Sequence, residues 1–116
     1  MPRVLVVDDE LRICKFLQRA LEAEGFDVDI ASGAHDALRL AEENDYALTI
    51  LDLLMPGMDG YEVARRFRQN TGLARVRLIA LTGYGQQLDR ERSQAAGFDH
   101  HLVKPAAPEQ LEELLR

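Results

Sequence analysis

The chain has no tryptophan, and aromatic residues make up only 6% of its 116 residues. No platform of aromatic side chains on which nucleic-acid bases could stack is therefore evident. Positive charge is also scarce, because 14 Lys and Arg residues stand against 20 Asp and Glu residues, a net charge of −6. A chain of this charge repels a phosphate backbone, so we expect no nucleic-acid binding by this domain.

The single cysteine, Cys14, excludes an internal disulfide. Its neighbours Ile13 and Phe16 predict a small side chain on or beside the buried face of a helix, rather than a reactive thiol. No apolar run approaches the roughly 18 residues of a membrane span. No signal peptide is visible either, because strand-like sequence begins at Arg3. We therefore expect a cytoplasmic domain without membrane contact.

Apolar residues make up 47% of the sequence, enough for the core of one domain that covers residues 1–116. Short apolar or β-branched runs alternate five times with segments of helical periodicity. The predicted strands are 3–7, 26–30, 46–52, 76–81 and 98–103, and the predicted helices are 11–24, 34–43, 60–69, 87–96 and 108–115. This alternation predicts an α/β fold, in which helices cover both faces of a parallel sheet.

Particular residues mark the ends of these helices. Gly25 is the expected C-cap of the first helix and Ser32 the expected N-cap of the second. Asp59 or Gly60 is expected to cap the third. The fourth predicted helix, 87–96, has little apolar content, which is typical of an element of low stability.

Asp52 ends the buried strand 46–52, and Pro56 and Gly57 stop that strand soon afterwards. In open α/β sheets, ligands bind at the carboxyl ends of the strands. A carboxylate buried there costs free energy unless a cation, a proton or a ligand interacts with it. We therefore predict that Asp52 is a reactive group.

Other strands also end in polar residues. The first ends in Asp8 and Asp9, the fourth in Thr82, and the fifth in Lys104. Because the carboxyl ends of parallel strands share one edge, these side chains are expected to meet Asp52 there. A lone Asp-Asp pair is usually a helix cap and a lone Lys-Pro a loop feature. The coincidence of four strand ends indicates a functional site.

Three carboxylates this close repel one another, and a hard divalent cation relieves the repulsion. Mg²⁺ takes oxygen ligands, of which one or two are carboxylates, together with water and a substrate phosphate. The backbone carbonyl of Leu54 is a further candidate ligand. Lys104 adds a positive charge and Thr82 a hydroxyl, a set that suits a phosphoryl group in line with a carboxylate nucleophile.

The sequence resembles a response-regulator receiver domain over essentially its whole length. The resemblance is carried by Val4–Glu10, Leu51–Gly60, Leu81–Gly83 and Leu102–Pro105. It implies a flavodoxin-like (βα)5 three-layer sandwich whose five-stranded parallel sheet has the order 2-1-3-4-5, an order known for this family.

The resemblance also implies roles for individual residues. Asp52 would accept a phosphoryl group from a phosphohistidine of a histidine kinase or a histidine phosphotransfer domain. Asp8, Asp9, Asp52 and the Leu54 carbonyl would hold Mg²⁺ or Mn²⁺. Lys104 would pair with a phosphoryl oxygen.

The remaining implied roles concern switching. Thr82 would move toward the acyl phosphate and shift the face formed by the fourth helix, the fifth strand and the fifth helix. Pro105 would hold the Lys104 loop, by family habit in a cis peptide. His101 stands where the family often has the Tyr or Phe that rotates with the threonine. An imidazole can rotate too, and it titrates near neutral pH.

The motifs most resemble receivers fused to sensor histidine kinases, so the domain is expected to be either free-standing or part of a hybrid kinase. Two other functions stay open. One is an aspartyl-phosphate phosphatase, although such enzymes usually carry a second acid where this chain has Leu54. The other is an interaction module that keeps the fold without phosphorylation. We expect a switch rather than an enzyme.

Overall fold

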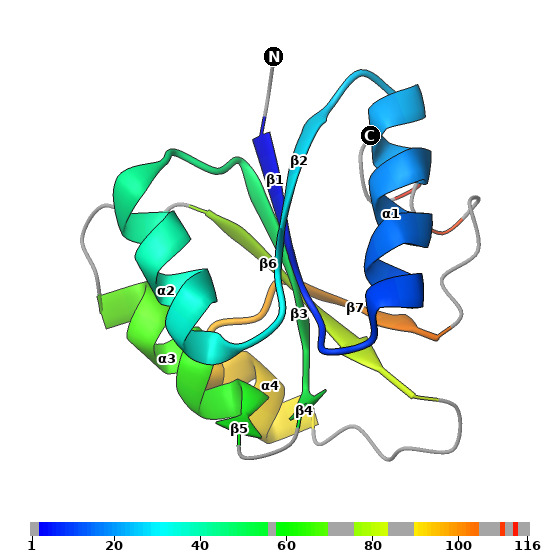
Figure 1. The fold of residues 1–116 in the computed structure, drawn as a ribbon. Helices are drawn as coiled ribbons and strands as arrows, with labels where there is room; N and C mark the ends of the chain where they lie inside the picture. Colours follow the sequence, from blue (N-terminus) through cyan, green and yellow to red (C-terminus); the bar gives the residue numbers. More distant parts are fainter. Residues whose placement is uncertain are drawn as a thin grey trace.

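The computed structural model describes residues 3–55, 58–69, 76–83, 90–104, 110 and 113. A five-stranded sheet forms its centre (Figure 1). The strands are β1 (Arg3–Val7), β2 (Asp27–Ala31), β3 (Leu48–Asp52), β6 (Arg77–Thr82) and β7 (His100–Val103). Their order is β2-β1-β3-β6-β7, and every neighbouring pair is parallel. This is the predicted order 2-1-3-4-5 of the flavodoxin-like fold, so the fold prediction is confirmed.

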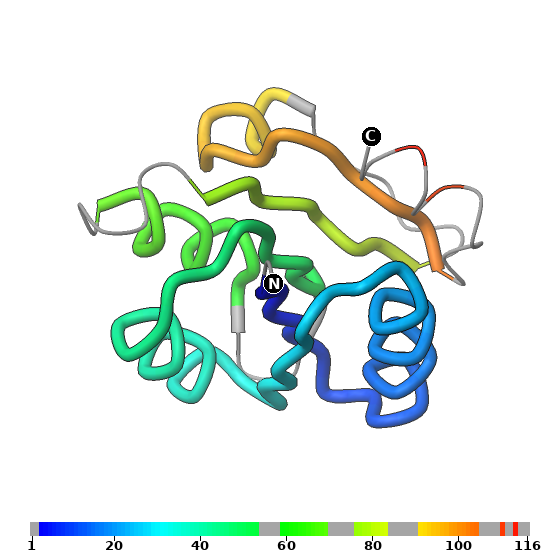
Figure 2. Tube along the Cα trace, turned by 90° about the horizontal axis from the view of Figure 1, so that it is seen from above, coloured from blue at the N-terminus to red at the C-terminus, as the bar shows by residue number. Residues whose placement is uncertain are grey.

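Helices cover both faces of the sheet. They are α1 (Leu11–Ala23), α2 (Ala34–Glu43), α3 (Gly60–Gln69) and α4 (Arg90–Ala96). Among them, α1 packs on one face, and α2, α3 and α4 pack on the other. Figure 2 shows this arrangement from above, with α1 and the pair α2 and α3 on opposite sides of the strands.

The core has two halves because each central strand buries side chains on both of its faces. In β1, Leu5 and Val7 join the α2–α4 half, whereas Val4 and Val6 join the α1 half. All five residues of β3 are buried. This explains why the strands read as continuous apolar runs rather than as alternating patterns. A polar residue at the end of such a strand, such as Asp8 directly after β1 or Asp52 at the end of β3, is therefore buried.

The helix ends differ in how well they were predicted. The C-cap of α1 is Glu24 rather than the predicted Gly25; Gly25 follows it with a φ of +94°, the left-handed conformation that glycine commonly adopts one residue after the cap. Asp59 caps α3, because its Oδ1 accepts a hydrogen bond from the backbone N–H of Tyr61 at 2.9 Å. The prediction for Ser32 was wrong. Gly33 occupies the N-cap position of α2, in extended conformation and without a side-chain capping bond.

The stretch after Asp52 contains a hairpin that the sequence did not predict. Two short strands, β4 (Leu54–Met55) and β5 (Met58–Asp59), pair in antiparallel fashion. The predicted fifth helix, 108–115, lies mostly outside the described residues, with only Gln110 and Glu113 among them. In the part of the chain that the structure covers, no helix is both long and apolar enough to cross a membrane.

Candidate functional site

The carboxyl edge of the sheet gathers the predicted acids. One carboxylate oxygen from each of Asp8, Asp9 and Asp52 lies within 4.8 Å of the other two. Asp8 and Asp52 are buried, whereas Asp9 is exposed. Asp8 and Asp9 follow β1, and Asp52 ends the neighbouring strand β3, so the parallel pairing of these strands brings the acids together.

Lys104 reaches the same edge from the far side of β6. Its Nζ lies 3.0 Å from Asp8 Oδ2 and 3.1 Å from Asp52 Oδ2. The backbone N–H of Lys104 donates to the carbonyl of Thr82 at 2.7 Å, which continues the β6–β7 pairing past the end of β7. The sheet itself therefore aims the lysine at the acids.

The backbone around Asp52 leaves little room. A Cβ added to Gly60 would lie 2.7 Å from Leu53 Cα and 3.0 Å from the carbonyl oxygen of Asp52. Real Cβ atoms do not approach backbone so closely, hence only glycine fits here. Because Gly60 is the first residue of α3, the start of this helix packs against the backbone of Asp52 and Leu53.

Burial shifts the protonation equilibria of the site. Desolvation raises the pKa of Asp8 from 3.8 to about 6, with the negative charge of Asp52 acting in the same direction. The hydrogen bond from the Glu10 backbone and the adjacent Lys104 ammonium group oppose this shift. Burial also lowers the pKa of Lys104, but its hydrogen bonds and charge interactions with Asp8 and Asp52 outweigh burial and raise that pKa above its ordinary value. The lysine is therefore cationic at neutral pH.

The donor set fits a hard divalent cation. Asp8 Oδ2 is buried, and no hydrogen bond of acceptable geometry reaches it although Lys104 Nζ is close. A buried carboxylate oxygen with incomplete hydrogen bonding, next to two further carboxylates, is what an oxygen-ligand site for Mg²⁺ offers. Asp8, Asp9 and Asp52 are thus the side chains that could hold a metal.

Thr82 lies at the end of β6, with 2% of its surface exposed. Its Oγ1 donates a hydrogen bond to the carbonyl of Leu102 in β7 at 3.2 Å. The hydroxyl therefore bridges the strand next to Asp52 and the strand that leads to Lys104. Leu54 lies in β4, next in the chain after Leu53, and Pro105 lies outside the described residues.

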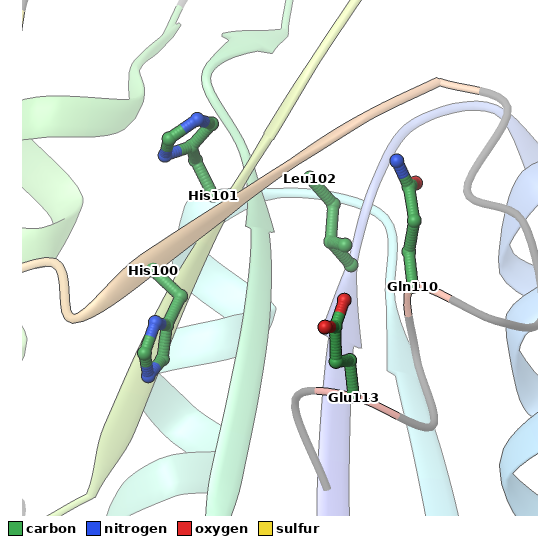
Figure 3. Close-up of a pocket in the computed structure, with 5 residues that line it drawn as sticks. All are labelled: His100, His101, Leu102, Gln110 and Glu113. Carbon is green, nitrogen blue, oxygen red and sulfur yellow. The ribbon is translucent and has the colours of Figure 1, made fainter.

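His101 is exposed on β7, the edge strand. In Figure 3 its side chain lies on the opposite side of the strand from those of His100 and Leu102. These three residues, with Gln110 and Glu113, line a pocket of about 370 Å³. The structure thus places His101 at a surface beside the edge strand rather than among the acids.

Sequence reasoning assigned no role to two further residues at this edge. Glu10 Oε1 lies 3.3 Å from Lys104 Nζ. The buried thiol of Cys14 donates to the Asp8 carbonyl oxygen at 3.2 Å, and burial raises its pKa to about 11. Glu10 follows Asp8 and Asp9 directly, so its position in the acidic run was a usable signal. The Cys14 contact had no such signal because it depends on how the first turn of α1 packs.

The fold and the site define a class: a doubly wound α/β domain with an acidic edge and a lysine, suited to Mg²⁺ and a phosphoryl group. The family model for the response regulator receiver domain matches residues 4–116 of this sequence. The chain belongs to this family.

Known proteins agree with this assignment. The transcriptional regulatory protein SrrA of Staphylococcus aureus is 39% identical over 108 residues, which cover 93% of this chain and 44% of SrrA. The chain thus spans less than half of the length of this relative. Chemotaxis response regulator CheY4 of Vibrio cholerae has 30% identity and a TM-score of 0.91, covering 99% of this chain and 96% of that one.

A second solved structure concerns the metal. The receiver domain of sensor histidine kinase PA1611 from Pseudomonas aeruginosa PAO1 was solved with a magnesium ion coordinated in its active-site cleft. It is 31% identical with a TM-score of 0.87, covering 98% of this chain and 93% of that domain. Magnesium binding by a receiver domain of this fold therefore has a direct precedent.

Proposed function

We propose that this domain accepts a phosphoryl group on Asp52 from a phosphohistidine of a histidine kinase or a histidine phosphotransfer domain. The observation that carries the proposal is the position of Lys104 Nζ, 3.1 Å from Asp52 Oδ2 at an edge where three carboxylates meet. Each buried charge costs desolvation free energy. An ion pair that served only to stabilise the fold would therefore rarely bury two acids beside one lysine.

In the proposed step, a carboxylate oxygen of Asp52 attacks the phosphorus atom and forms a P–O bond. The P–N bond to the donor histidine breaks, and its electron pair returns to the imidazole nitrogen, which takes up a proton. Lys104 donates to an oxygen of the transferring group and stabilises its negative charge. Asp8, Asp9, Asp52 and the Leu54 carbonyl would hold Mg²⁺ or Mn²⁺, which when bound neutralises charge on the phosphoryl oxygens.

The switch is proposed to run through Thr82. In the present structure its hydroxyl donates to the Leu102 carbonyl. An acyl phosphate on Asp52 offers charged acceptor oxygens, and hydrogen bonds to charged acceptors are stronger than those to carbonyls. Thr82 would therefore turn toward the phosphoryl group, and α4, β7 and the C-terminal segment would adjust. His101, exposed on β7, would rotate with it, and Pro105 would hold the loop after Lys104.

The experiment is phosphorylation by acetyl phosphate with Mg²⁺, followed by intact mass spectrometry. We expect a mass gain of one phosphoryl group in the wild type and none in Asp52→Asn. Asp45→Asn, which removes an exposed acid outside the site, serves as the matched control and should behave as wild type. A mass gain that persists in Asp52→Asn contradicts the assignment. Absence of any gain in wild type, with Mg²⁺ binding also absent, favours a pure interaction module.

The cellular setting follows from the same proposal. The likeness to SrrA supports a response regulator and the likeness to the PA1611 receiver supports a hybrid histidine kinase as the source of this domain. We propose a cytoplasmic switch rather than an enzyme, with no nucleic-acid or membrane contact by this domain, since the net charge of −6 disfavours both anionic surfaces. Release of phosphate from a model ester over many turnovers would instead indicate the phosphatase.

A further inference from the structure

Three carboxylates surround the ammonium group of Lys104. Nζ lies 3.0 Å from Asp8 Oδ2, 3.1 Å from Asp52 Oδ2 and 3.3 Å from Glu10 Oε1. A lysine ammonium has three N–H donors and no acceptor. Among the described residues, Nζ donates hydrogen bonds to Asp52 and to Glu10, while Asp8 lies at ion-pair distance. A phosphoryl oxygen that binds this lysine therefore competes with these carboxylates for its donors.

The three acids differ in how easily they can give way. The Asp8 and Asp52 side chains are almost fully buried, and Asp8 Oδ1 also accepts a hydrogen bond from the Glu10 backbone N–H at 2.9 Å. The Glu10 side chain is 60% exposed. Water can solvate the Glu10 carboxylate if it leaves the lysine, whereas the buried acids would lose their compensation.

The start of α1 points to the same residue. Glu10 occupies the N-cap position of this helix, yet its side chain makes no capping hydrogen bond. N-cap positions favour Ser, Thr, Asp and Asn, whose short side chains reach back to the helix N–H groups. Here the longer Glu side chain extends to Lys104 instead. The helix start thus lacks a side-chain cap while its N-cap residue contacts the site.

On the basis of the phosphoacceptor function proposed above, we propose that Glu10 is a positioning residue that competes with the phosphoryl group for Lys104. In the unphosphorylated domain, Glu10 holds one donor of the lysine and places a negative charge where the phosphoryl oxygens arrive. On phosphorylation, its carboxylate leaves for solvent and the donor passes to the phosphoryl group. Glu10 therefore lowers the affinity of the site for phosphoryl-like anions without touching the nucleophile.

The test uses beryllofluoride, BeF₃⁻, a phosphoryl analogue, titrated calorimetrically in the presence of saturating Mg²⁺. An exposed ion pair is worth at most about 1 kcal/mol, so we expect Glu10→Gln to bind BeF₃⁻ about two- to fivefold more tightly than wild type. Glu22→Gln is the matched control, since it removes the same charge from an exposed position near the other end of α1. It should show wild-type affinity.

Glu10→Asp separates the contact from the charge. It keeps the negative charge but withdraws the carboxylate by one methylene, so we expect a gain similar to that of Glu10→Gln. Titration with Mg²⁺ alone provides the second readout: Glu10→Gln should bind it no more tightly than wild type, because the variant loses an anionic neighbour of the acids. A damaged site would instead weaken both ligands.

Several results overturn the inference. They are a BeF₃⁻ affinity in Glu10→Gln equal to or weaker than wild type, an equal gain in Glu22→Gln, and wild-type affinity in Glu10→Asp. These results are distinct from failure of the proposed function. If the proposed function is wrong, wild type itself binds neither Mg²⁺ nor BeF₃⁻. If only the present inference is wrong, wild type binds both ligands, and the Glu10 variants bind BeF₃⁻ no more tightly than wild type or Glu22→Gln gains equally.

Discussion

The charged groups at the carboxyl edge of the sheet and those between α3 and α4 use the same chemistry in different surroundings. At the edge, the Lys104 side chain is 14% exposed and its partners Asp8 and Asp52 are almost fully buried. Between the helices, Arg92 pairs with Asp59 at 3.0 Å, and both side chains are about half exposed. Water screens the second pair but not the first, so the same type of contact has different consequences.

Arg68 is intermediate between these two extremes. Its side chain is 23% exposed, and it donates from α3 to the carbonyl of Gly97 and to Asp99 Oδ2. It also donates to the carbonyl of Val76. The C-terminal end of α4 is therefore fixed by a half-buried arginine, while Arg92 holds the other end from the surface. The contacts at the C-terminal end of α4 are therefore less exposed to solvent than the Arg92–Asp59 pair.

The largest effect is expected from Lys104→Met. This change leaves Asp8 and Asp52 buried without their cation, and breaking a buried pair costs about 3 kcal/mol or more. We expect the free energy of unfolding in urea at pH 7 without Mg²⁺ to fall by about that amount. Part of the loss should be recovered at pH 5, where Asp8 is protonated. Lys15→Met, on the exposed face of α1, should change stability little. An equal loss of stability in this variant would show that burial of the Lys104 site does not cause the effect.

A smaller effect is expected from Arg68→Met. The carbonyls of Gly97 and Val76 and the Asp99 carboxylate lose a charged donor, and hydrogen bonds of this kind contribute about 2 kcal/mol. Urea unfolding measures the loss. Arg66→Met, on an exposed arginine of the same helix, is the matched control. If both variants unfold alike, Arg68 does not fix the end of α4.

The buried edge also predicts a pH dependence of stability and of Mg²⁺ binding. The pKa of Asp8 is raised to about 6, so in the absence of Mg²⁺ the folded state holds this proton more tightly than the unfolded chain. Asp8 therefore makes the folded state less stable as pH rises from about 4 to about 6. Mg²⁺ needs the carboxylate form.

Mg²⁺ affinity should accordingly be constant above pH 6 and fall below it, approaching tenfold per pH unit, about 1.4 kcal/mol. Calorimetric titration between pH 5 and 8 measures this. Asp8→Asn, which cannot titrate, should bind more weakly, with a flatter profile over this range. A wild-type affinity that stays constant down to pH 5 contradicts the predicted role of Asp8.

The smallest effect is expected from Arg92→Met. Its pair with Asp59 is exposed, and its guanidinium carbon lies 4.2 Å from the centre of the Tyr61 ring. Together these contacts contribute about 1 kcal/mol at most. Global stability should change by less than this, while hydrogen exchange of α4 amides should accelerate more than that of β6 amides. Equal acceleration in both elements would show that Arg92 does not act locally on α4.

Much of the fold could be predicted from the sequence because an apolar run followed by a segment of helical periodicity recurs five times. The apolar runs alone predict strands over 3–7 and 46–52; β1 has the predicted bounds, and β3 begins two residues later, at Leu48. Helices α2 and α3 have the bounds that periodicity predicts. The hairpin formed by β4 and β5 was not predicted, since two strands of two residues leave no periodic pattern. Ser32 failed as a cap because the chain places Gly33 at the start of α2.

For the site, the residue pattern alone indicates which groups stand at the strand ends: Asp8, Asp9, Asp52, Thr82 and Lys104. Parallel pairing then requires these ends to share an edge, so their approach was predictable. The three-dimensional packing was needed to show which acids are buried, how one lysine contacts Asp8, Asp52 and Glu10, and that Cys14 donates to the Asp8 carbonyl. The physical reason is that burial and contact depend on how side chains far apart in the chain pack. The local sequence pattern indicates only which strand a residue belongs to and where along that strand it lies.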